Sequence, residues 1–107
     1  MNVTEYVSRA LSDKDFLVDA FRHVPAESLQ VQVPESDKGD IGKVLTRYLW
    51  PLAQDMGYDF GEDELHEECE RQAAALKGLA KVRLASRVVR SVTKVVRERE
   101  QDREQPR

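Results

Sequence analysis

The sequence predicts an all-α fold, a small four- or five-helix bundle that ends in a long C-terminal amphipathic helix. Three observations support this prediction. Apolar residues recur at spacings of three and four along most of the chain, which is the period of an amphipathic helix. Only residues 29–33 alternate apolar and polar side chains as a strand does, and without a partner strand we expect them to be extended. Residues that favour helix N-caps precede the periodic stretches, at Asn2, Ser12, Asp40 and Asp59.

The first helical stretch covers residues 2–24 and contains an internal capping signal. Asn2 with Glu5 predicts one helix start, and Ser12 with Asp15 predicts a second. We therefore expect either two short helices that meet at Ser12 or one helix with a kink there, ended by Pro25.

The middle of the chain is predicted to be a loop followed by a helix. Residues 25–40 are rich in proline, glycine and polar side chains and indicate a connection. Asp40 then caps a helix that ends at Gly57. Pro51 lies inside this helix and is expected to kink or restart it. Tyr48 and Trp50 follow the apolar spacing of this helix, so we expect them to pack in the core.

The last helix is predicted to be the longest, over residues 61–97, with a weak point at Gly78. Its second half has an apolar stripe at helical spacing, and a basic stripe runs along nearly the opposite face. Valine is a poor helix former, so tertiary packing must hold this helix. Residues 98–107 contain no apolar side chain and are expected to form a disordered charged tail, which leaves one helical domain over residues 1–97.

Charge divides the chain into two parts. Its formal net charge is −3, but residues 1–70 contain 16 acidic and 6 basic side chains, and residues 71–107 contain 4 acidic and 11 basic ones. The sequence therefore predicts an acidic body, residues 1–70, followed by a basic helical arm, residues 71–97. Such a division favours either a charged partner or docking of the two parts on each other.

No arrangement of reactive residues indicates catalysis, a metal or a cofactor. His66 and Cys69 lie three residues apart on one predicted helix, but a structural zinc site needs four ligands, and the chain has no second such pair. His23 is the only other histidine, and no nucleophile with a base and an orienting group stands out. We therefore expect a protein that is not an enzyme.

Composition and the N-terminal residues indicate the compartment. The first residues have neither the basic opening nor the apolar core of a secretory signal, and no apolar run is long enough to span a membrane. The lone Cys69 excludes an internal disulfide and fits a reducing environment. We expect a cytoplasmic protein.

Two stretches, EYVSRALSDKDFLVDAF at residues 5–21 and AQDMGYDFGEDEL at residues 53–65, together resemble a known family. The chain is similar over residues 3–70 to the nitrogen-fixation-eleven type (nif-eleven-like) leader-peptide domain family. That resemblance implies a helical domain that is bound by enzymes that modify ribosomally made peptides. The chain departs from a precursor because it has no Gly-Gly pair and no cysteine besides Cys69. The resemblance therefore implies a stand-alone relative that uses the same scaffold for binding.

The functional hypotheses all involve the C-terminal helix. The first is a non-catalytic protein-binding module, an accessory or recognition protein in bacterial ribosomal-peptide or secondary-metabolite biosynthesis. It would bind another protein, or itself as a homodimer, through Val82, Val89, Val92 and Val96. The alternative is a nucleic-acid-binding protein that uses the basic face formed by Arg83, Arg87, Arg90, Lys94 and Arg97. A membrane-surface role is a third hypothesis, and docking of the basic face on the acidic body is a fourth.

Overall fold

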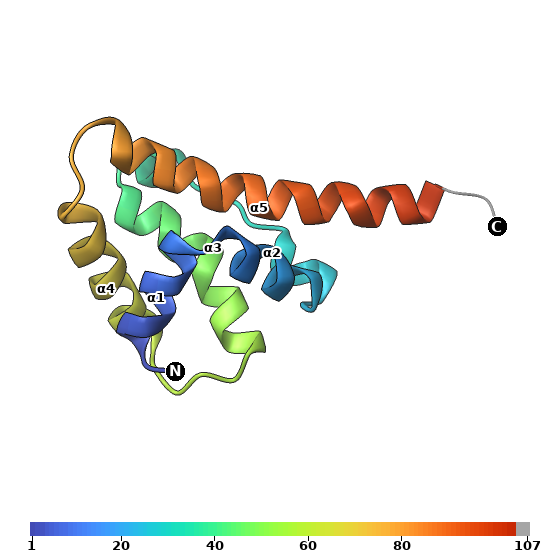
Figure 1. Cartoon of the computed structure of the whole chain (residues 1–107), viewed down its shortest axis with the longest axis horizontal. Coiled ribbons are helices and arrows are strands. Elements are labelled where there is room, and N and C mark those ends of the chain that lie inside the picture. Colours follow the sequence, from blue (N-terminus) through green and yellow to red (C-terminus); the bar gives the residue numbers. More distant parts are fainter. Residues whose placement is uncertain (105–107) are drawn as a thin grey trace.

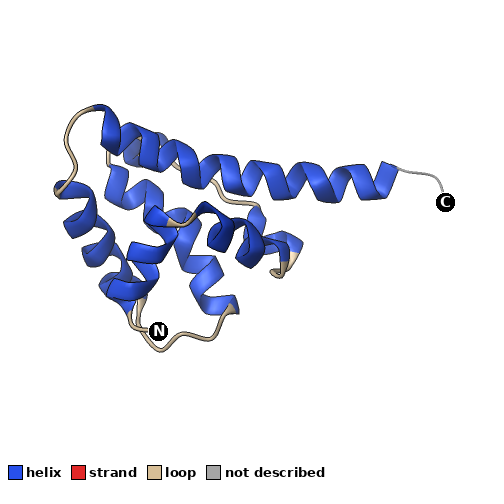
Figure 2. Cartoon of the chain, in the orientation of Figure 1, coloured by secondary structure: helices blue, strands red, loops and turns tan. Residues whose placement is uncertain are grey.

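The computed structural model describes residues 1–104, and within them the fold is all-α, as predicted (Figure 2). It consists of α1 (Val3–Ser12), α2 (Lys14–Arg22), α3 (Ile41–Asp55), α4 (Glu62–Ala74) and α5 (Leu79–Glu104), with short 3₁₀ helices η1 (Ala26–Leu29) and η2 (Glu35–Asp37) between α2 and α3. Helix α5 lies across one side of the bundle formed by α1–α4 and projects beyond it (Figure 1). No helix of residues 1–104 is long and apolar enough to cross a membrane.

The N-terminal stretch forms two helices, and the break between them falls at Asp13, one residue after the expected position. Asn2 caps α1, because its side-chain oxygen accepts a hydrogen bond from the amide of Glu5 at 2.8 Å. Asp13 has an extended backbone, and its Oδ1 accepts from the amides of Asp15 and Phe16. The Ser12 hydroxyl instead donates to the carbonyl of Ser8 and does not cap α2.

Helix α3 begins at its predicted cap and continues through its proline. The Oδ1 of Asp40 accepts a hydrogen bond from the amide of Lys43 at 3.2 Å. Pro51 lies within the 15 residues of α3, which run unbroken to Asp55. Gly57 then adopts a φ of 76°, a conformation that favours glycine and reverses the chain toward α4.

The expected single helix over residues 61–97 is wrong, because the structure has two helices there. Helix α4 ends at Ala74, and α5 begins at Leu79. Gly78 between them has a φ of 61°, which takes the chain out of the right-handed helical conformation. The start of α4 also differs from the prediction, since its N-cap is Gly61, whose amide donates to the carboxylate of Glu64.

The core lies where all five α-helices meet. Its fully buried large side chains come from each of them: Tyr6, Val7, Leu17, Phe21, Leu45, Leu49, Leu52, Leu65, Cys69, Val88 and Val95. The hydroxyl of Tyr6 donates to the carbonyl of Leu49 at 2.8 Å, which satisfies this polar group inside the core. Tyr48 and Trp50 are partly buried against the same core. The predicted basic arm is thus an integral part of the bundle.

The charged C-terminal segment is helical as far as Glu104, whereas we expected a disordered tail from residue 98 onward. Contacts with α2 explain the extension. Arg22 pairs with Glu98, and Arg99 donates to the main-chain carbonyls of Phe21 and Arg22 at the C-terminal end of α2. Residues 105–107 of the expected tail lie outside the described residues.

Candidate functional site: a basic groove between α2 and α5

The four valines predicted to bind a partner lie in three different environments. Val92 is 5% exposed and belongs to the core of the chain itself. Val89 and Val96 are partly buried, and Val82 is 55% exposed. The stripe is therefore covered along most of its length by the chain's own α2 and α3, which supply apolar surface opposite it. Among the four valines, only Val82 offers a large accessible apolar surface, next to Leu79, which is 71% exposed.

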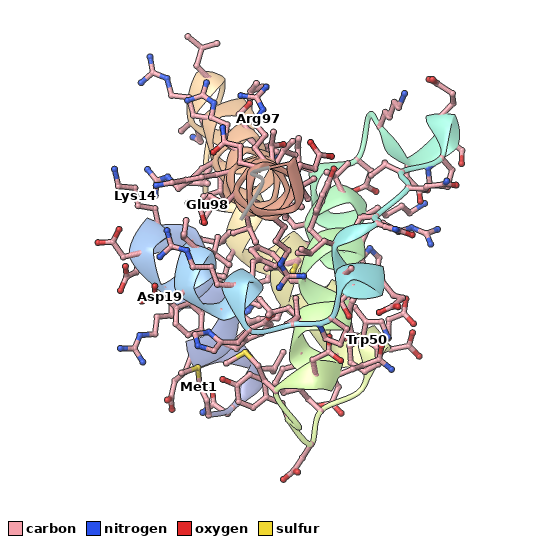
Figure 3. All side chains as sticks on the ribbon, turned by 90° about the vertical axis from the view of Figure 1, so that its right-hand side faces the viewer. Met1, Lys14, Asp19, Trp50, Arg97 and Glu98 are labelled. Atoms are coloured by element: carbon pink, nitrogen blue, oxygen red, sulfur yellow. The ribbon has the colours of Figure 1, made fainter. Side chains whose placement is uncertain are left out.

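The five basic residues predicted on α5 are all exposed, and four of them share one surface feature. Arg83, Arg87, Arg90 and Lys94 line a groove between α2 and α5 with a volume of about 1090 Å³. Arg97 is not part of its lining, and in Figure 3 it points away from the bundle on the far side of α5. The complete lining is Lys14, Asp15, Val18, Asp19 and Arg22 from α2, and Val82, Arg83, Ser86, Arg87, Arg90, Ser91 and Lys94 from α5.

Sequence analysis missed the wall of the groove that α2 provides. Lys14, Val18 and Arg22 recur at intervals of four, so they lie along one side of α2. That spacing is a signal in the sequence, but nothing in the sequence indicates that this side of α2 faces α5. In Figure 3, Lys14 and Asp19 extend from α2, and Glu98 points from α5 toward that helix.

The cations of the groove differ in whether they form hydrogen bonds with other groups of the protein. Arg22 donates from Nε and Nη2 to the two carboxylate oxygens of Glu98, at 3.1 and 3.0 Å. Arg87 donates from Nη1 to the main-chain carbonyl of Leu11 at 2.9 Å, which ties α5 to the end of α1. The hydrogen bond from Arg22 and its positive charge hold the pKa of the Glu98 carboxyl below its usual value.

Four further cations of the same groove remain without such partners. Lys14 on α2, and Arg83, Arg90 and Lys94 on α5, form no hydrogen bond or ion pair with any side chain of residues 1–101 or with the main chain that the structure describes. Lys94 acts on the Glu98 carboxyl only through its charge. The facing wall contains two acids, of which Asp19 lies 3.5 Å from Nη1 of Arg22. Positive charge therefore exceeds negative charge in the groove, and the excess is concentrated on α5.

The groove offers charge and apolar surface for recognition. Its lining contains six cations, two carboxylates, two serines and two valines. One serine, Ser91, donates its hydroxyl to the carbonyl of Arg87 within its own helix. This set of side chains fits the binding of an anionic partner with some apolar contact.

The residues weighed as metal ligands lie outside the groove. His66 places its Nε2 3.0 Å from Oε1 of Glu70 on the same helix. Cys69 is completely buried, and burial raises the pKa of its thiol to about 12. Within residues 1–104 there is no group of three or more His, Cys, Asp and Glu side chains placed to hold a metal ion.

No protein-family model, curated protein or solved structure matches this chain. The fold and the groove define it as a small all-helical protein with a basic groove between its second and last helices. The resemblance to the nif-eleven-like leader domains stays a prediction from the two quoted stretches.

Proposed function

We propose that this chain is a non-catalytic protein-binding module that holds an acidic segment of a protein in the groove between α2 and α5. The observation that carries the proposal is the set of unpaired cations on one wall, Arg83, Arg90 and Lys94. Exposed charges of this kind contribute little to the stability of a fold, but they provide electrostatic complementarity toward a partner.

The other side chains of the groove favour a protein partner. Val18 and Val82 line it beside the cations, and Leu79 is exposed close to Val82 in the sequence. An amphipathic helix that enters a groove between two helices uses such apolar positions as anchors and its charged residues for orientation. We therefore expect a partner segment that combines carboxylates with a few apolar side chains.

Nucleic acid is the second candidate, because the exposed basic residues of α5 follow one another at helical spacing, as a phosphate-binding helix requires. One feature of the groove counts against single-stranded nucleic acid. The lining contains no aromatic side chain on which bases could stack.

The sequence resemblance supplies the biological setting of this proposal. It points to an accessory or recognition protein of bacterial ribosomal-peptide or secondary-metabolite biosynthesis, acting in the cytoplasm. Under that hypothesis the groove would hold an acidic segment of a peptide-modifying enzyme or of its substrate.

Fluorescence anisotropy tests the proposal with three labelled probes: an acidic amphipathic peptide, a DNA duplex and a single-stranded RNA of similar total charge. The acidic peptide should bind, and the double variant Arg83→Gln/Arg90→Gln should weaken that binding by about tenfold, since charge complementarity is lost. The matched control is Lys77→Gln/Arg97→Gln, which removes two exposed cations outside the groove lining and should bind as the wild type does.

The two candidate functions predict different results in that experiment. Unchanged peptide binding by the groove variant would overturn the proposal. Tighter binding of duplex or RNA than of peptide at about 0.15 M salt, lost in the groove variant, would establish the nucleic-acid alternative instead.

A further inference from the structure

Helix α5 runs alongside α2 in the same direction, so the two ends of the groove can be distinguished. At one end, Arg87 donates to the carbonyl of Leu11, which lies just before α2. At the other end, Glu98 pairs with Arg22, the last residue of α2. Lys14, the first residue of α2, therefore belongs to the end of the groove near Arg87.

At the Arg22 end, positive charge is already compensated within the chain. The guanidinium of Arg22 lies 3.0 Å from the carboxylate of Glu98 and 3.5 Å from that of Asp19. A carboxylate of a partner would have to displace Glu98 before it could form the same bidentate pair. This end of the groove therefore offers little to an additional anion.

At the opposite end, cations without a partner lie on both walls. Arg83 and Arg90 on α5 and Lys14 on α2 form no hydrogen bond or ion pair with any described side chain. In Figure 3, Lys14 extends from α2 to the height of α5. Asp15 also lines the groove here, but among the described residues it forms no ion pair with these cations. Like charges on facing walls repel each other, and an anion bound between them would remove that repulsion.

A hydroxyl group adds to this set of donors. Ser86 follows Arg83 by three residues and precedes Arg90 by four, so the three side chains share one side of α5. The hydroxyl of Ser86 forms no hydrogen bond within the part of the chain that the structure describes, whereas that of Ser91 donates to the carbonyl of Arg87. The Lys14 end thus offers two guanidinium groups, an ammonium group and a hydroxyl.

We propose that this end of the groove is a subsite for a phosphate monoester dianion, carried by a phosphorylated side chain of the segment that the groove holds. The inference rests on the proposed function, because it names one group of that segment. A carboxylate has one charge and two oxygens, which a single guanidinium satisfies in bidentate geometry. A phosphoryl group carries about −1.5 to −2 charges near neutral pH and has three terminal oxygens, so it can accept from both walls at once.

Fluorescence anisotropy tests the subsite with labelled peptides that share one acidic amphipathic sequence and differ at a single position, which is phosphoserine, glutamate or serine. This position is moved along the peptide by one helical turn at a time, so that one register places it beside Lys14. In that register the phosphopeptide should bind about tenfold more tightly than the glutamate peptide, because the dianion reaches cations on both walls. Free O-phosphoserine should displace it only at a much higher concentration than the unlabelled phosphopeptide does.

A substitution on α2 locates the subsite. Lys14→Gln should remove most of the advantage of the phosphopeptide and change binding of the serine peptide little, since it alters one wall at one end of the groove. Lys43→Gln removes another exposed lysine near a helix start, outside the groove, and should bind all three peptides as the wild type does. Neither lysine side chain forms a hydrogen bond with described residues, so circular dichroism should show an unchanged fold.

The pH dependence of binding gives an independent readout. The second pKa of a phosphoryl group is about 6, so the advantage of the phosphopeptide should shrink as the pH falls from about 7.5 to about 5.5. The groove lining contains no histidine, the side chain that ordinarily titrates in this range. An advantage that stays constant over this range would contradict recognition of the dianion.

The outcomes distinguish this inference from the proposed function. Equal affinity for the phosphopeptide and the glutamate peptide in every register, or an advantage that persists in Lys14→Gln, overturns the inference. Free O-phosphoserine that binds as tightly as the phosphopeptide also overturns it, because the groove would then hold a free phosphate monoester. If the glutamate peptide binds through Arg83 and Arg90 and the phosphopeptide binds no better, the proposed function stands and only the subsite is wrong. If none of the peptides binds, both proposals fail.

Discussion

Arg22 on α2 and Glu98 on α5 are joined by two parallel hydrogen bonds, although 76 residues separate them in the sequence. The guanidinium donates from Nε and Nη2, one bond to each carboxylate oxygen, which is the bidentate geometry that fixes orientation best. The next residue, Arg99, donates to the carbonyls of Phe21 and Arg22 at the C-terminal end of α2. These contacts explain why α5 continues as a helix past the apolar stripe.

The first prediction concerns the Arg22–Glu98 pair. Arg22→Leu should increase hydrogen exchange of the backbone amides in residues 97–101, because the end of α5 loses the Glu98 pair and keeps only the Arg99 hydrogen bonds to α2. Both side chains are substantially exposed, at 44% and 38%, so the midpoint of global unfolding should change little. Arg97→Leu is the control. Equal hydrogen exchange in the two variants would contradict the role of the Arg22–Glu98 pair in holding the end of α5 on α2.

The second prediction concerns Glu68, a buried carboxylate between α4 and α1. Burial alone raises the pKa of Glu68, but hydrogen bonds from Gln72, Arg71 and Thr4 and the charge of Arg71 outweigh it, so the pKa lies below its usual value. Glu68→Ala should reduce the free energy of unfolding by about 1–3 kcal/mol, since these donors lose their acceptor. Urea denaturation measures this loss, and Glu67→Ala, at an exposed neighbour, is the control.

The third prediction is the pH dependence that follows from Glu68. A carboxyl whose pKa is lower in the folded than in the unfolded protein stabilises the fold above its unfolded pKa, and this contribution disappears as the pH falls through the folded value. The wild type should therefore lose stability as the pH falls below the usual glutamate range. Glu68→Gln should lose less over the same range, and parallel curves of unfolding free energy against pH would refute this origin.

The fourth prediction tests the close approach of α3 and α4 at Gly42. A Cβ at this position would collide with Cγ of Glu70 and lie 3.2 Å from its Cα. Gly42→Ala should lower the free energy of unfolding by about 1 kcal/mol, because the cost of overpacking exceeds the gain in helix propensity. Gly39→Ala is the matched control, since a Cβ there meets nothing within 4 Å. A stabilised Gly42→Ala protein would show that the helices separate freely.

The fifth prediction compares two valines of the same helix. Val92→Asp should destabilise the protein by about 3 kcal/mol or more, because it places a carboxylate in the core without a partner. Val82→Asp should change stability by no more than about 0.5 kcal/mol, since more than half of this side chain is exposed. Thermal unfolding of both variants provides the test, and similar losses would mean that the stripe is not buried as described.

Local features of the sequence were sufficient for the helical class and for several of the helix ends. The side chains of Asn2 and Asp40 cap the helices that they were predicted to cap, and Gly57 ends α3. These outcomes depend on hydrogen bonds and backbone preferences within a few residues of each other, which is why the sequence alone predicts them. The same local signals were ambiguous at residues 12–13, where neighbouring side chains compete for the free amides.

The break at Gly78 and the extension of α5 to Glu104 needed more than local signals. A single glycine inside a periodic pattern is compatible with both a continuous helix and a reversal, and here the packing of α5 across α2 and α3 requires the reversal. The charged residues after Arg97 have low tendency to be ordered alone. They are helical because Glu98 and Arg99 contact α2, a segment more than 70 residues earlier.

The candidate site likewise has features that the sequence predicts and features that depend on the packing of distant segments. The helical period of residues 79–97 already predicts opposed apolar and basic faces on α5, because it sets which side chains share a side. The packing of the folded chain is needed to see that the apolar face is covered by the chain's own body, and that the basic face forms a groove with Lys14 and Arg22 of α2. A stripe of side chains specifies what kind of surface must lie opposite it, whereas the arrangement of distant segments determines which surface that is.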